Sequence, residues 1–133
     1  LDTLEYLSAE AKNYLPPLPI AYDGNLGCYL EMLEMSGGHG GDNLPKSQAI
    51  KDACMAHNIL INLPSNGVFI HYNGAFHSQN KEGIAWYLLN ENPDLKIMTI
   101  DATEQEFINE LEQERMDIAD FIIVTPSSLT KTH

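Results

Sequence analysis

Three segments of the chain each place a chemically active side chain just after a possible strand. Apolar runs with the composition of strands occur at 68–72, 95–100 and 119–124. The residues that follow these runs include His77, Asp101 and Ser127. Because ligands of open parallel sheets bind beyond the carboxyl ends of the strands, we expect these three side chains to share one cleft. A neutral imidazole there can ligate a metal ion or accept a proton.

Further candidate residues surround His77 in the sequence. Gly74 lets the chain turn sharply after the first run, and Tyr72 at the end of that run can direct its phenol into the cleft. His39 stands between two glycine pairs, in a loop that a bound ligand would order. His77 is therefore a candidate ligand of a metal ion or cofactor, and Gly74, Tyr72 and His39 are further candidates for the same site. Spacing alone leaves open that His77 only caps the next helix.

His57 has a different setting, in the middle of the apolar face of a predicted helix over 45–62. Buried polar groups are normally hydrogen-bonded, so a histidine on such a face is expected to be a core residue bonded to a backbone carbonyl. We expect His57 to matter for stability rather than for ligand binding.

Residues 1–63 form a helical region in this interpretation. Apolar residues recur at helical spacing in three segments, which predicts helices over 2–14, 23–35 and 45–62. A glycine-rich loop at 36–43 separates the second helix from the third.

Residues 64–133 form a parallel α/β region. Helices are predicted at about 80–91 and 104–115, between the three apolar runs, which gives a βαβαβ order. Connections of this length imply parallel strands joined by right-handed crossovers. Three strands make a small parallel sheet, and such sheets are normally covered on both faces. We therefore expect this single domain or fragment to be an incomplete part of a larger α/β domain, completed by a missing N-terminal segment or a partner chain.

The composition excludes several classes of protein. Nineteen acidic residues against seven basic ones give a net charge of −12, whereas nucleic-acid binding needs a basic surface. No apolar run approaches the roughly 20 residues of a membrane-spanning helix. Cys28 and Cys54 lie far apart within helical patterns and are predicted to be free thiols. The start at Leu1, without an initiator methionine, is expected of a mature or trimmed product.

Two stretches together resemble a known family. Residues 48–57 (QAIKDACMAH) are similar to the Gln-x-x-(Lys/Arg)-Asp-x-x-Met-Ala pattern of the ChaN-type haem-binding uptake proteins. Residues 74–77 (GAFH) match the Gly-x-x-His motif that this family shares with the wider Tiki superfamily. Gly83 and His39 also fit the family pattern, and the resemblance covers about residues 3–125.

The resemblance implies a haem- or iron-binding protein of the cell envelope, a periplasmic protein or a membrane-anchored lipoprotein, that takes part in haem uptake. It implies a parallel α/β core with added helices, haem as the cofactor and His77 among its binding residues. It also implies a longer protein, with either a homodimer or the missing N-terminal segment as the partner. Residues 78–82 lack the Arg and Tyr that family members carry before the glycine, which leaves Lys81 as the nearby cation for a haem propionate.

A second function follows from the wider superfamily. Tiki relatives include metal-dependent peptidases, so the alternative is a hydrolase in which His77 and acidic residues of the missing half hold a divalent metal ion. A third interpretation is a structural fragment whose site lies elsewhere. The sequence leaves open whether the protein is an enzyme.

Overall fold

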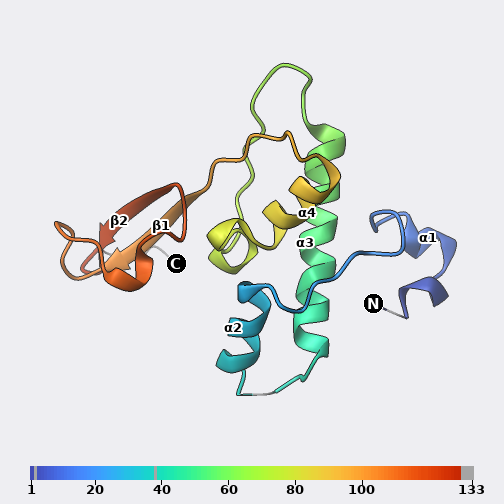
Figure 1. Ribbon diagram of the computed structural model, residues 1–133, viewed down its shortest axis with the longest axis horizontal. Coiled ribbons are helices and arrows are strands. Elements are labelled where there is room, and N and C mark those ends of the chain that lie inside the picture. The colour runs from blue at the N-terminus through green and yellow to red at the C-terminus, as the bar shows by residue number, and fades with distance from the viewer. Residues whose placement is uncertain (2, 38, 130–133) are drawn as a thin grey trace.

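A computed structural model gives the structure of the protein, and it describes residues 1, 3–37 and 39–129. One long helix, α3 (Asn43–Asn62), runs through the centre of the molecule, and α2 (Gly27–Met35) and α4 (Ile84–Glu91) pack against it. The N-terminal segment with the short helix α1 (Ala9–Lys12) lies on one side of these helices, and a two-stranded sheet lies on the other (Figure 1). The three packed helices therefore form the body that can position a site.

The main core lies between α3 and α4. It is formed by small and branched residues of α3 and by large residues of α4: Ala53, Ala56, Ile59, Ile84, Tyr87 and Leu88. The small alanines of α3 let the larger side chains of α4 approach the helix closely. A second cluster joins α2 to α3, where Cys28 and Tyr29 pack on Ala49. Both cysteines are free thiols, as predicted, with Cys28 buried and Cys54 partly buried.

Leu88→Ala tests the main core. Leu88 is 6% exposed, and removing a buried leucine side chain costs its transfer free energy and leaves a cavity. We expect the free energy of unfolding to fall by about 2–5 kcal/mol, measured by urea denaturation. Ile61→Ala is the matched control, because Ile61 is 64% exposed and exposed substitutions usually change stability by about 0.5 kcal/mol or less. Equal losses in the two variants would contradict this placement of the core.

The sheet consists of β1 (Ile100–Gln105) and β2 (Phe121–Pro126), which pair in parallel with Ile100 opposite Phe121. Asp120 fixes the start of the pairing, because its carboxylate accepts hydrogen bonds from the backbone N–H and the hydroxyl of Thr99. The side-chain amide of Gln105 donates to two carbonyls of the connecting loop, which holds this loop against the sheet. Helices with a small parallel sheet give a mixed α/β fold, as the sequence predicts.

The three-stranded βαβαβ arrangement is not confirmed. Residues 68–72 form no strand, and Val68, Ile70 and Tyr72 are 85%, 70% and 90% exposed. A strand needs a partner for its backbone N–H and C=O groups, and no described segment pairs with this one through backbone hydrogen bonds. Figure 1 shows the segment within a long loop above the helices. Completion of the sheet by further strands stays a prediction.

The predicted helix over 104–115 is wrong. Residues 101–105 belong to β1, and the loop that follows contains only a short 3-10 helix, Gln113–Arg115. Pairing with β2 takes up the backbone groups of the residues that would start the helix, so tertiary contact overrides the local signal. The predicted helix over 2–14 is also divided, into the 3-10 helix Leu4–Tyr6 and α1.

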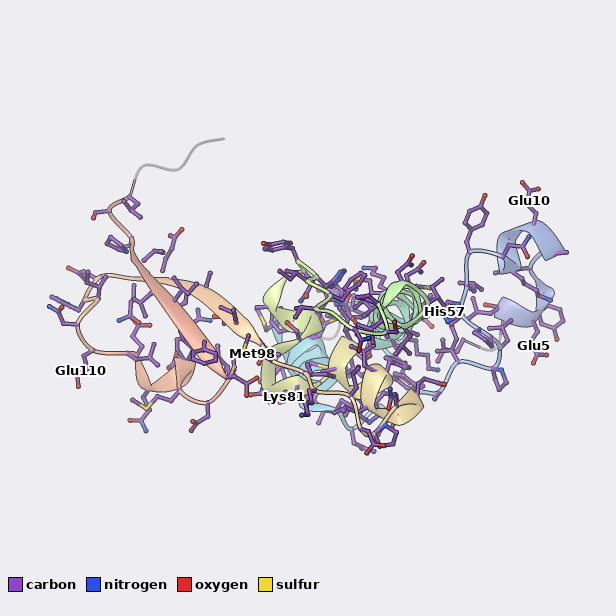
Figure 2. All side chains as sticks on the ribbon, turned by 90° about the horizontal axis from the view of Figure 1, so that it is seen from above. Glu5, Glu10, His57, Lys81, Met98 and Glu110 are labelled. Atoms are coloured by element: carbon purple, nitrogen blue, oxygen red, sulfur yellow. The ribbon has the colours of Figure 1, made fainter. Side chains whose placement is uncertain are left out.

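The sheet is tied to the loop that precedes α4. The backbone N–H of Asn80 donates to the carbonyl of Ile118, and Lys81 forms an ion pair of 2.7 Å with Asp120. Figure 2 shows Lys81 at this junction between the helices and the sheet.

None of the helices in the described part of the chain is long and apolar enough to cross a membrane.

Candidate functional site

His77 lies at the end of a short 3-10 helix, Ala75–His77, and its ring faces α3. Its Nδ1 is 2.5 Å from Oδ1 of Asp52, which projects from the middle of α3. The Asp52 side chain is 0% exposed, whereas that of His77 is 20% exposed. The pair therefore has a buried carboxylate on its inner side and a partly accessible imidazole on its outer side.

Asp52 is held on both of its oxygens. Its Oδ2 accepts a hydrogen bond of 2.9 Å from the Tyr29 hydroxyl, which comes from α2 and is fully buried. Burial raises the pKa of the Asp52 carboxyl, although the hydrogen bonds from His77 and Tyr29 act against this change. Burial and the adjacent Asp52 carboxylate also raise the pKa of the Tyr29 phenol, so this hydroxyl keeps its proton and remains a donor. Three elements thus meet at one carboxylate.

Gln48 covers the imidazole from one side. It lies one helical turn before Asp52 on α3, and its amide nitrogen is 2.8 Å from Nδ1 and 3.1 Å from Nε2 of His77. An atom in the ring plane cannot be this close to both nitrogens without overlapping the carbon between them, so the amide lies over the face of the ring. His77 Nε2 therefore has no in-plane hydrogen-bond partner among the described residues. We call Tyr29, Gln48, Asp52 and His77 the histidine cluster.

Gly83 allows the chain to pass close to the histidine cluster. Its φ of +53° is in the left-handed region, and a Cβ there would lie 2.6 Å from the His77 carbonyl oxygen and 3.3 Å from Asp52 Oδ2. The neighbouring Glu82 carboxylate accepts from the backbone N–H groups of Gly27 and Cys28, at 3.0 and 2.6 Å, and so caps α2. The loop of His77 is therefore fixed to both α2 and α3.

Apart from Gly74, the other predicted site residues form no hydrogen bond with His77 in the structure. Tyr72 is 90% exposed, His39 is exposed in the loop after α2, and neither forms a hydrogen bond with the histidine cluster. Asp101 and Ser127 form no hydrogen bond with His77 either. Asp101 lies within β1 rather than after a strand, because the strand begins later than its apolar run. A shared cleft is not formed by these residues.

Gly74 has a different role from the one expected. Its φ of −70° and ψ of 151° are open to any residue, so the turn does not require glycine, and a Cβ there would meet only His77 Cδ2 at 3.9 Å. Its carbonyl accepts a hydrogen bond of 3.0 Å from the His77 backbone N–H. The glycine that the backbone requires is Gly83.

His57 is not a core residue, in contrast to the prediction. It is partly buried and lines a hollow with residues of the N-terminal segment, among them Lys12 and Leu18. Figure 2 shows it at the side of α3 that faces this segment.

Sequence reasoning missed the partners of His77. Gln48 and Asp52 stand in the helix motif that carries the family resemblance, and their spacing of four residues puts them on one face of α3. This shared helix face is the sequence feature from which Gln48 and Asp52 could have been predicted as site residues. Tyr29 carries no comparable signal, because its contact with Asp52 depends on how α2 packs.

The histidine cluster offers one ring nitrogen to a ligand. No group of three or more His, Cys, Asp or Glu side chains close enough to hold a bare metal ion occurs among the described residues. Haem iron needs fewer protein ligands than a bare metal ion, since the porphyrin supplies four nitrogen ligands and the protein supplies an axial one. A ligating histidine usually donates its other ring N–H to a carboxylate, which is the arrangement of His77 and Asp52. The residues present fit a haem iron ligand.

Fold and site together define a mixed α/β protein with one accessible histidine held by a buried carboxylate. The family model described as "Haem-binding uptake, Tiki superfamily, ChaN" matches residues 1–88, which include the whole histidine cluster. The chain belongs to this family. Comparison with curated proteins and with solved structures gave no match.

Proposed function

We propose that this protein binds haem for uptake, with Nε2 of His77 as the axial ligand of the iron. The family supports haem as the ligand, and the observation that carries the assignment to His77 is its hydrogen bond with the buried Asp52. Bound haem supplies an iron with open axial positions, and the protein supplies the imidazole and the surface on which the porphyrin rests.

The chain around His77 offers apolar contact for a porphyrin. Phe76 is partly buried beside the histidine, and Ile70 and Tyr72 are exposed in the segment that leads to it. Lys81, the nearby cation for a haem propionate, forms an ion pair with Asp120 and is 44% exposed. Propionate binding by Lys81 would therefore compete with this ion pair.

The wider role follows the family. Location at the cell envelope, as a periplasmic protein or a lipoprotein, and a homodimer are part of the same proposal and rest on the resemblance. Their support is the family's connection with haem uptake.

Titration with ferric haem tests the proposed function. We expect a shift of the Soret band that saturates at a defined ratio of haem to protein, because a single imidazole ligand gives a single site. Absorbance that rises linearly without saturation, as for free haem, would contradict the proposal. Tight binding of zinc or manganese in a parallel titration, with no uptake of haem, would favour the metal-dependent hydrolase instead.

A further inference from the structure

Asp52 contacts the imidazole that we propose as the iron ligand, and its contacts bear on how this imidazole is protonated and oriented. The inference rests on the proposed function. We propose that Asp52 is a positioning residue: held by Tyr29, it fixes the proton of His77 on Nδ1, presents Nε2 to the iron and makes this nitrogen a stronger donor to ferric than to ferrous haem. Neither the family match nor the motif assigns this role to Asp52.

The proton placement follows from the donors around the carboxylate. Tyr29 donates its hydroxyl to Oδ2, and an ionised carboxylate can only accept, so the 2.5 Å contact at Oδ1 requires the proton on His77 Nδ1. With Nδ1 protonated, a neutral imidazole has its lone pair on Nε2, where it can bind iron. A protonated Asp52 would donate to Nδ1 and place the ring proton on Nε2, which would remove the ligand.

The ring is also fixed in orientation. Gln48 covers one face of the imidazole, and the space beside the His77 carbonyl is too narrow for a side-chain carbon at Gly83. Asp52 itself is 0% exposed and cannot exchange its partners for water. The imidazole is therefore directed before any ligand arrives, and this lowers the cost of ordering it on binding.

The charge of Asp52 has a consequence for the iron. A carboxylate that accepts the second N–H of a ligating histidine raises the basicity of the imidazole, and the higher electron density stabilises the more highly charged metal. Among the described residues the Asp52 carboxylate accepts hydrogen bonds from Tyr29 and His77. Its charge therefore acts directly on the imidazole through the contact at Oδ1.

The first test uses the haem-free protein. We expect nitrogen-15 NMR of labelled histidine to show His77 protonated on Nδ1 and unprotonated on Nε2. Asp52→Asn should give a mixture of the two tautomers, because an amide can donate or accept. Asp94→Asn is the matched control, since it removes the same charge from an exposed position and should leave the His77 signals unchanged. A wild-type His77 protonated on Nε2 would overturn the proposal.

The second test compares the two oxidation states of bound haem. Loss of a hydrogen-bond partner of a metal-ligating residue typically costs 10–100-fold in affinity, and we expect Asp52→Asn to lose about this much for ferric haem and less for ferrous haem. If the ferric loss exceeds the ferrous loss tenfold, the midpoint potential rises by about 59 mV. An unchanged potential with an unchanged tautomer would overturn the proposal.

Tyr29→Phe provides a second variant in case Asp52→Asn does not fold. It removes one hydrogen bond from Asp52 and keeps the ring, so the potential should move in the same direction by a smaller amount. No shift in this variant would overturn the role of Tyr29. If the wild-type protein takes up no haem, the proposed function is wrong, and so is the proposed effect of Asp52 on the iron. The tautomer measurement on the haem-free protein would still decide whether Asp52 positions His77.

Discussion

His77→Ala is expected to lower the affinity for ferric haem by about 100-fold or more. Changing a residue that merely supports a metal ligand typically costs 10–100-fold, and the ligand itself should cost at least as much. The remaining described histidines lie outside the histidine cluster, so no second imidazole is placed there to substitute for it. Added imidazole should restore part of the haem affinity by occupying the vacated position. The measurement is a Soret titration with and without imidazole.

The same substitution has a cost in stability that must be controlled. Asp52 loses a partner for Oδ1 while it stays buried, and an unsatisfied buried acceptor costs about 1–3 kcal/mol. Affinities should therefore be compared at equal folded fraction. His71→Ala is the matched control: it removes an exposed imidazole six residues away and should leave haem affinity unchanged. Equal affinity of wild type and His77→Ala for haem would leave His77 as a structural residue only.

Gly83→Ala is expected to destabilise the protein and to weaken haem binding at the same time. The backbone angles of Gly83, φ of 53° and ψ of −117°, cost a non-glycine residue about 1–3 kcal/mol, and overpacking adds typically 1–3 kcal/mol. The added methyl group would lie 2.6 Å from a backbone oxygen, which cannot move away as a flexible side chain can. The carbonyl belongs to His77, so relief of the clash displaces the imidazole. Thermal unfolding and haem titration measure the two effects.

Gly74→Ala is the matched control for this prediction. Gly74 belongs to the same loop, but its backbone is ordinary and the space beside it is open. We expect its stability to stay equal to that of wild type or to rise by a few tenths of a kcal/mol, because alanine restricts the unfolded chain. A Gly83→Ala variant as stable as Gly74→Ala would contradict the close approach of the chain at Gly83.

Helical periodicity predicted the helices of this protein well. The predicted segments 23–35, 45–62 and 80–91 correspond to α2, α3 and α4, with boundaries that differ by a few residues. The information in these helices is local, since the apolar residues that recur along each helix are the ones that pack. The segment of residues 2–14 failed because Ser8 is extended and caps α1, which divides the pattern.

Strand prediction failed where pairing decides the outcome. Residues 68–72 have the composition of a strand but no pairing partner among the described residues, whereas residues 104 and 105, at the start of the predicted helix over 104–115, lie in β1. A strand depends on a segment far away in the sequence, and its own residues do not reveal whether that segment is present. The parallel pairing of the two strands was nevertheless predicted, from the length of the connection between their apolar runs.

The candidate site was predicted at its histidine but not at its partners. His77 was found from a short motif, whereas its contact with Asp52 spans 25 residues and requires the 3-10 helix to dock on α3. Asp52 reads as an ordinary polar residue in a helix until the burial of its carboxylate is known. Gly74 was chosen over Gly83 because the sequence shows a glycine but not the backbone angle that requires it.

The central claim is that His77 binds the iron of haem, and the vibration of the iron–imidazole bond tests it most directly. Resonance Raman spectra of the ferrous haem complex should show an iron–histidine stretching band in the wild-type protein. The band should be absent from His77→Ala. It should return when imidazole is added, at the frequency of a ferrous haem complex with unattached imidazole. A band that persists unchanged in His77→Ala, or a wild-type complex that lacks it, would contradict the assignment of His77 as the axial ligand.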